Sequence, residues 1–177
     1  MRQLRSGQIQ GRLRGGCTRS TRDRLLAEVR ALAADPELAD QRLEFNTSGT
    51  VLGIAAEVLA AHIAATAGDS ASARKHFEAA VALEDAMVYG EPPEWSVPVR
   101  QEFGAVLLAQ GDPAAAERIF REDLERFPAN GWSLHGLAGS LRAQGHIREA
   151  RAATAEFERM WEGSRLPVTQ ADPGYVW

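Results

Sequence analysis

The side chains that could do chemistry in this 177-residue chain are few and scattered. The four histidines include His62 and His135, and none of them stands in an HExxH spacing or beside a Cys/His cluster. Cys17 is the only cysteine, which excludes an intrachain disulfide and a cysteine-based metal cage. Glu91 and Glu94 could be read as paired carboxylates, but acid–base work needs one of them buried with a shifted pKa. We therefore predict no catalytic residue, no metal site and no cofactor.

Other side chains are better suited to binding than to catalysis. Aromatic and arginine side chains dominate interface energetics, which singles out Trp132 and Trp95 and, on the same segment as Trp95, Tyr89. For Trp132 we favour a structural role over a binding role. A Trp close to the boundary between two structural repeats, which are described below, commonly fills the core between them. Arg100 also has two interpretations: it could present its guanidinium to an anion, or pair with Glu91 or Glu94 to pin that segment.

Helices are the elements that must position these residues. Around residues 97–130, apolar side chains recur at helical spacing on two successive segments, each with one apolar stripe: Phe103, Leu107 and Leu108, then Ala116, Ile119, Phe120 and Leu124. Gly111 suits the left-handed residue that ends the first helix, Asp112 can cap the second, and Pro113 fits its first position. Alternating strand patterns are absent.

The same pattern returns after 34 residues. Gly111 and Gly145 mark the interval, and LLAQGDPAAAERIF at 107–120 is echoed by LRAQGHIREARAAT at 141–154. This period and wording resemble the tetratricopeptide repeat, a helix-turn-helix unit of about 34 residues. Its signature positions fall on Phe103, Gly104, Leu107, Gly111, Ala116, Phe120, Leu124 and Pro128, while Asp123 replaces a usual small residue and Thr154 stands where a Phe is expected. The resemblance implies an all-α, right-handed α-α superhelix of about three helix pairs.

The chain divides by composition and repeat register. We expect a disordered basic tail at 1–20, an N-terminal helix and turn at 21–47 with Leu25, Leu26, Val29 and Leu32 buried, repeats at 48–84, 97–129 and 130–163, an insert at 85–96 and a C-terminal tail at 164–177. Residues 51–67 are very apolar but fall short of the roughly 20 residues of a membrane span. Motifs such as EPPEW and NGWSLHGLA also resemble the C-terminal part of longer bacterial tetratricopeptide proteins.

Charge argues against a nucleic-acid groove. Residues 1–24 hold seven arginines and one aspartate, a net charge of +6, whereas the rest holds 13 basic and 23 acidic residues, a net charge of −10. The acidic body is unlike a surface built for phosphates. The leader lacks the apolar region of a secretory signal, so we expect a cytoplasmic protein that neither binds nucleic acid nor spans a membrane.

In the tetratricopeptide family the first helix of each pair lines a concave groove. Carried onto this chain, the groove positions are Val58, His62, Gln101, Ala105, Leu108, Trp132, His135, Gly139 and Arg142. The resemblance therefore implies a non-catalytic scaffold that binds a protein or peptide partner. Two alternatives stay open: a small-molecule or enzyme site where the 85–97 insert closes over Arg100, Gln101 and His135, and a self-associating spacer that uses exposed end helices.

Overall fold

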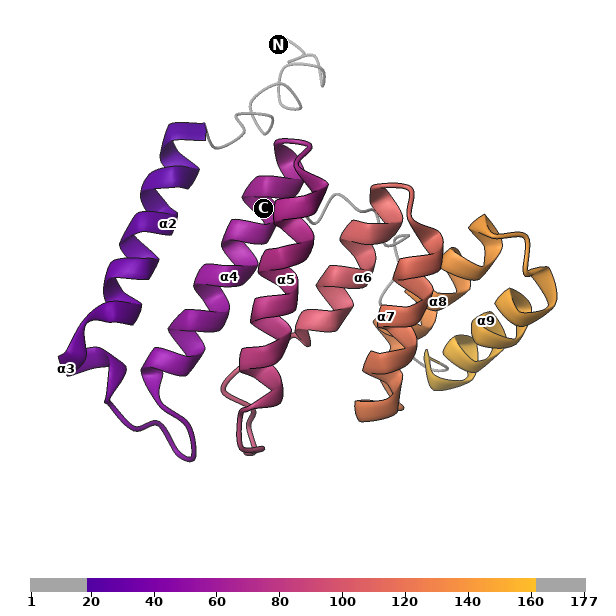
Figure 1. Cartoon of the computed structure of the whole chain (residues 1–177). Helices are drawn as coiled ribbons and strands as arrows, with labels where there is room; N and C mark the ends of the chain where they lie inside the picture. Colours follow the sequence, from indigo (N-terminus) through magenta and orange to yellow (C-terminus); the bar gives the residue numbers. More distant parts are fainter. Residues whose placement is uncertain (1–18, 162–177) are drawn as a thin grey trace, which may run out of the picture.

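The computed structural model describes residues 19–161, and over these residues the chain is a row of stacked helices (Figure 1). Each helix packs mainly on its neighbours in sequence, as in a helical solenoid, which confirms the predicted all-α fold. No strand is present in this range. The helices are α2 (Arg19–Ala34), α3 (Pro36–Ala39), α4 (Ser48–Thr66), α5 (Ser70–Asp85), α6 (Val99–Ala109), α7 (Pro113–Arg126), α8 (Gly131–Ala143) and α9 (Ile147–Trp161).

In each of the helix pairs α4–α5, α6–α7 and α8–α9, an equivalent turn joins the two helices. Gly68, Gly111 and Gly145 adopt φ values of 79°, 81° and 79°, the left-handed conformation that costs glycine little. The carboxylates of Asp69 and Asp112 then accept hydrogen bonds from the backbone N–H groups of the following helices. The turn chemistry expected from the sequence is confirmed, and it makes the two helices of each pair antiparallel.

Phenylalanine rings fill the core where successive pairs meet. Phe77 of α5 stacks on Phe103 of α6 with ring centroids 5.0 Å apart. Phe120 of α7 is 2% exposed and lies against two glycines, one on each neighbouring helix. A Cβ at Gly104 would come to 2.7 Å from this ring, and one at Gly136 to 2.2 Å. Both positions must therefore stay small for α6 and α8 to close on Phe120.

The N-terminal helix differs from its prediction in two respects. α2 begins at Arg19, so two residues assigned to the disordered tail are helical. Its half-buried side chains include Leu26 and Val29, but Leu25 and Leu32 are 41% and 46% exposed. The reason is that α2 packs mainly on α4, with the short α3 at its end, and no helix of the described residues covers its outer side. The expectations for the rest of the basic tail and for the tail at 164–177 lie outside the described residues.

One helix of the described part, α4, is long and apolar enough to cross a membrane when judged by length and composition alone. It is 19 residues long, so the argument that this stretch is too short does not hold. In the structure α4 packs between α2 and α5, and Ile54 and Ala61 are fully buried. A core helix passes the same test, and core packing is the role seen here.

Candidate functional site

The helices α6 and α8, the first members of their pairs, lie directly against each other. Their approach is close because Gly139 carries no side chain: a Cβ there would be 3.3 Å from Cδ2 of Leu108. Leu108 and Gly139 are both among the groove positions carried over from the family. The structure thus brings groove positions of two repeats into one neighbourhood, which sequence spacing alone does not establish.

Three of the candidate binding residues lie on one side of α8, beside α9. Trp132 packs edge-on against Trp161, with ring centroids 5.8 Å apart. His135 makes the same kind of contact with Phe157 at 5.6 Å. Phe157 and Trp161 stack on each other at 5.3 Å, so the four rings form one cluster, which we call the α8–α9 aromatic cluster.

Trp132 is the exposed member of this cluster. The expectation that it fills the core between repeats is wrong, because 41% of it is accessible to solvent. The cause lies in α9: where α7 carries Phe120, α9 carries the smaller Thr154, and its aromatic rings come one and two turns later, at Phe157 and Trp161. These rings pack against Trp132 and His135 of α8, and the indole of Trp132 stays at the surface.

His135 and Arg142 add polar character to the same side of α8. Burial lowers the pKa of His135 from its ordinary value, and the positive charge of Arg142 lowers the pKa further. A neutral imidazole both donates and accepts a hydrogen bond. Arg142 is exposed and donates from Nη2 to Oγ1 of Thr154 at 3.1 Å. It lines a groove along α9 together with Ile147, Ala150, Arg151, Thr154, Ala155 and Glu158.

Gln101 lies on α6 and is engaged at the joint between the last two repeats. Its Oε1 accepts a hydrogen bond from Nδ2 of Asn130 at 3.2 Å. Nδ2 of Asn130 also donates to Oδ2 of Asp123 at 2.8 Å, and Oγ of Ser133 donates to that oxygen at 2.6 Å. Gln101 is half-buried, so its polar group helps to position the start of α8.

Asp123 is the residue at this joint that sequence reasoning undervalued. It is fully buried, and burial raises its pKa although the hydrogen bonds from Ser133 and Asn130 act in the opposite direction. The sequence signal that could have drawn attention to Asp123 was that it replaces the small residue usual at this position of the repeat. The two donors come from the beginning of α8 and both bond Oδ2, whereas Oδ1 is buried without a hydrogen-bond partner, which agrees with the raised pKa.

Arg100 has a structural partner that was not anticipated. Its guanidinium makes two hydrogen bonds of 2.7 Å to the carboxylate of Asp85, and its side chain is only 12% exposed. Arg126 of α7 contacts the same carboxylate. The suggested pairing of Arg100 with Glu91 or Glu94 is therefore wrong. The guanidinium instead ties the end of α5 to α6 and is not free to meet a ligand anion.

His62 is also unavailable to a binding partner. It is 9% exposed, its Nε2 lies 2.6 Å from Oε2 of Glu102, and its ring packs edge-on against Phe77. This placement corrects the prediction that His62 lines an open groove. A second imidazole–carboxylate pair, His76 with Glu57 at 2.6 Å, joins α4 to α5. Sequence reasoning missed both pairs because the partners are 40 and 19 residues apart.

The insert lies elsewhere than over the groove. Asn46 donates to the carbonyl of Val88 and accepts from its N–H, both at 2.8 Å. Glu94 accepts a hydrogen bond from the backbone N–H of Phe45 at 3.4 Å. Apart from short-range bonds to the end of α5, the hydrogen bonds of residues 86–96 named here run to the turn before α4. Asp85, the first residue of the predicted insert, does bond Arg100, but it belongs to α5. In the described part of the chain, residues 86–96 make no hydrogen bond to Arg100, Gln101 or His135, so the closure that an enzyme site would need is not what the structure shows.

The four candidate residues of the insert have different surroundings. Trp95 is half-buried and packs against the core. Tyr89 is 69% exposed and Glu91 is exposed, whereas Glu94 is half-buried beside Phe45. Within residues 19–161, no three His, Cys, Asp or Glu side chains come together in a way that could hold a metal ion. The described site therefore offers an aromatic cluster, hydrogen-bonding groups and exposed arginines at positions 142 and 151.

Comparison with known proteins agrees with this geometry. Residues 107–156 match the family described as Tetratricopeptide repeat. The match begins in the last turn of α6, covers α7 and α8, and ends within α9. Neither the curated proteins nor the solved structures contain a match to this chain. The likeness to longer bacterial proteins of the family stays a prediction. The match at 107–156, the three equivalent turns and the stacked helix pairs together support a tetratricopeptide-repeat assignment for these helices.

Proposed function

We propose that this protein is a non-catalytic scaffold that binds a protein or peptide partner along the solvent side of α8. The tetratricopeptide repeat generally suggests such a role. The observation that carries the proposal is the exposure of Trp132 at 41% on top of a packed aromatic cluster. A large ring held in place by its neighbours loses little conformational entropy when a partner covers it, and Trp is enriched among residues that dominate binding energy.

The neighbouring side chains support a peptide as the partner. His135, kept neutral, can donate to or accept from a peptide group, and the exposed Arg142 can meet a carbonyl or a carboxylate. These two residues and Trp132 recur at positions i, i+3 and i+10 of one helix, so they form a line about 15 Å long. An extended segment of about five residues covers that length.

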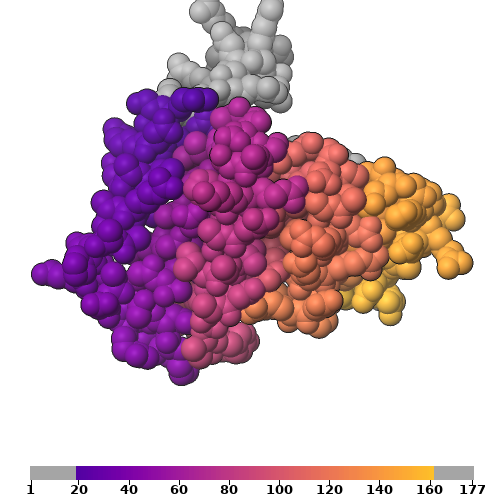
Figure 2. All heavy atoms as spheres, in the orientation of Figure 1, coloured from indigo at the N-terminus to yellow at the C-terminus, as the bar shows by residue number. Residues whose placement is uncertain are grey.

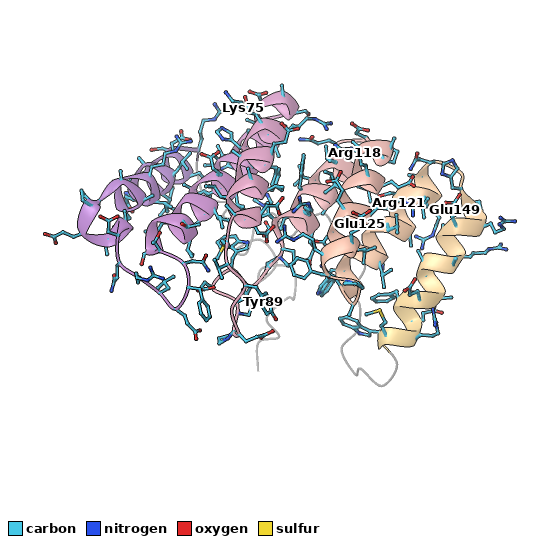
Figure 3. The ribbon with its side chains drawn as sticks, turned by 60° about the horizontal axis from the view of Figure 1, so that its bottom comes forward. Lys75, Tyr89, Arg118, Arg121, Glu125 and Glu149 are labelled. Carbon is cyan, nitrogen blue, oxygen red and sulfur yellow. The ribbon has the colours of Figure 1, made fainter. Side chains whose placement is uncertain are left out.

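The test is affinity capture with two matched double variants. Trp132→Ala/Arg142→Ala removes the anchor and the cation from α8, whereas Lys75→Ala/Arg118→Ala changes exposed residues on α5 and α7, labelled near the upper edge in Figure 3. We expect partners retained by the wild type to be lost from the first variant and kept by the second. Identical captured sets in all three samples would remove the α8 surface from consideration.

Self-association is a second candidate because α2 leaves Leu25 and Leu32 exposed on its outer side. Two copies could cover these side chains mutually. Size-exclusion chromatography at two concentrations distinguishes the candidates: a spacer shifts to a larger species on concentration, and Leu25→Ser/Leu32→Ser abolishes the shift. A concentration-independent monomer would reject self-association and leave the α8 proposal unaffected.

A further inference from the structure

Two loops at one edge of the solenoid are locked together by named contacts. Asn46, 8% exposed, uses its side-chain amide to bond both backbone groups of Val88. At Gly90 a Cβ would come to 3.1 Å from the ring of Phe45, so the two loops lie in close contact there. Figure 2 shows the atoms of the two loops adjoining at the lower edge, where indigo meets magenta. We call residues 40–47 and 86–98 together the loop platform.

The loop platform exposes an unusual amount of apolar surface. Ten large hydrophobic residues are exposed in the described part of the chain, and five of them belong to these two loops. Tyr89, at 69%, is the most exposed of the ten, and its side chain projects from the lower edge in Figure 3. The five are Leu43 (41%), Phe45 (47%), Val88 (56%), Tyr89 (69%) and Val97 (41%). Grouped exposure of this kind on a fixed support marks an interaction surface.

The charges of the loop platform are predominantly negative. Asp40, Glu44, Glu91 and Glu94 face one arginine, Arg42, which gives a formal charge of −3. Hydrogen bonds from its own backbone N–H and from the side chain of Asn46 lower the pKa of Glu94, so this carboxylate is ionised at neutral pH. Glu44 and Glu91 are exposed and have no ion-pair partner within residues 19–161. An occupant of this surface should be both basic and apolar.

The chain contains one such segment beyond the described residues. Residues 1–18 carry four arginines and no acidic residue, a formal charge of +4, and interleave them with Leu4, Ile9 and Leu13. The segment joins α2 at Arg19, and α2 leads through α3 to the loop platform at its far end (Figure 1). A 16-residue helix is about 24 Å long, whereas 18 extended residues span up to about 60 Å. The segment is therefore long enough to reach the platform of its own chain.

We propose that the loop platform is the docking site for residues 1–18 of the same chain. Arginines of the segment face the carboxylates of Glu44, Glu91 and Glu94, and its aliphatic side chains cover Tyr89 and Val88. Opposite charge brings the segment to the surface, and burial of apolar area holds it there. This surface is distinct from the α8 site, so neither proposal depends on the other.

A cysteine in the middle of the segment allows a direct test: Gln8→Cys in a Cys17→Ser background gives the chain a single labelling site, eleven residues before α2 begins. A nitroxide attached to the cysteine at position 8 of the full-length, ¹⁵N-labelled Gln8→Cys/Cys17→Ser chain should broaden the amide signals of Phe45, Val88 and Tyr89, and reduction of the nitroxide should restore them. The broadening should fade in 1 M NaCl, where the Debye length falls to about 3 Å from about 8 Å at 0.15 M. Undiminished platform signals at low salt would overturn the proposal.

Matched variants test whether the carboxylates matter. Glu44→Gln/Glu91→Gln should abolish the broadening, whereas Glu78→Gln/Glu125→Gln, which removes two exposed carboxylates from α5 and α7, should leave it intact. Equal broadening in both variants would contradict charge-guided docking. The amide spectrum itself reports that each variant is folded.

Docking within one chain needs a separate control. Nitroxide-labelled, unenriched chain is mixed with ¹⁵N-labelled Cys17→Ser chain, so that any broadening arises between molecules. We expect none in this mixture. Broadening of platform signals there would show that a second copy supplies the segment and would overturn the assignment to the same chain.

Discussion

Gly136→Ala tests how tightly α8 closes on the core. The added Cβ would lie 2.2 Å from Cζ of Phe120, whereas ordinary contacts between carbon atoms are about 3.5 Å or longer. The ring would have to retreat by more than about 1 Å. It has no room to do so, because the ring is 2% exposed and Gly104 holds it from the opposite side.

The expected magnitude follows from two opposing effects. Overpacking of a well-filled core costs about 1–3 kcal/mol, and the upper end applies because the neighbour is a rigid aromatic ring. Replacing glycine by alanine inside a helix recovers up to about 1 kcal/mol. We therefore expect Gly136→Ala to lower the free energy of unfolding by about 2 kcal/mol.

Gly139→Ala is the matched control, three residues along the same helix. Its Cβ would meet only the flexible end of Leu108, at 3.3 Å, so the gain in helix propensity should dominate and stability should be unchanged or up to about 1 kcal/mol higher. Urea unfolding followed by circular dichroism measures both variants. If Gly136→Ala is as stable as Gly139→Ala, the described packing of Phe120 is wrong. Phe120→Leu in the Gly136→Ala background should lose less than the sum of the single changes.

Three further predictions concern the core and the turns. Phe120→Ala should cost about 3–5 kcal/mol in urea unfolding, because the flanking glycines cannot fill the cavity, and a loss below about 0.5 kcal/mol would mean that the repeat register is wrong. Gly111→Ala should cost about 1–2 kcal/mol by the same assay, since alanine must adopt a φ near 81°, and an unchanged midpoint would contradict that strain. Burial raises the pKa of Asp123 above its ordinary 3.8, so the folded state binds the proton more tightly than the unfolded state. The contribution of protonated Asp123 to the free energy of unfolding is then greatest below pH 3.8, and it is lost as the pH rises through the raised pKa of the folded state. Asp123→Asn should flatten that part of the decline of unfolding free energy with pH, and identical pH profiles of variant and wild type would refute it.

The structure explains why one candidate site residue stayed at the surface and two did not. Trp132 remains accessible because α9 supplies its aromatic rings late, at Phe157 and Trp161. His62 occupies a groove position by spacing and Arg100 was a candidate for its guanidinium, yet carboxylates of other elements, Glu102 and Asp85, engage them. Periodicity predicts the side of a helix on which a residue lies, but it does not identify the charged residue of another helix that contacts it.

Local patterns alone determined the helices and their turns in this protein. The 34-residue interval between Gly111 and Gly145 and the cap at Asp112 predict helix ends to within a residue or two, because turn and capping energies depend on residues only a few positions apart. The sequence also indicated Phe120 as a core residue through its stripe. These features require no knowledge of which helix lies beside which.

Only the tertiary structure decided which side chains are available for binding and where the insert lies. Asn46 meets Val88 across 42 residues, and Asp85 meets Arg126 across 41, so neither contact leaves a periodic trace in the sequence. Such contacts depend on the distance between successive helix pairs and on the course of the loops between them. That geometry is set by the packing of the whole row of helices, and it is the physical reason why the binding surface could not be read from the chain alone.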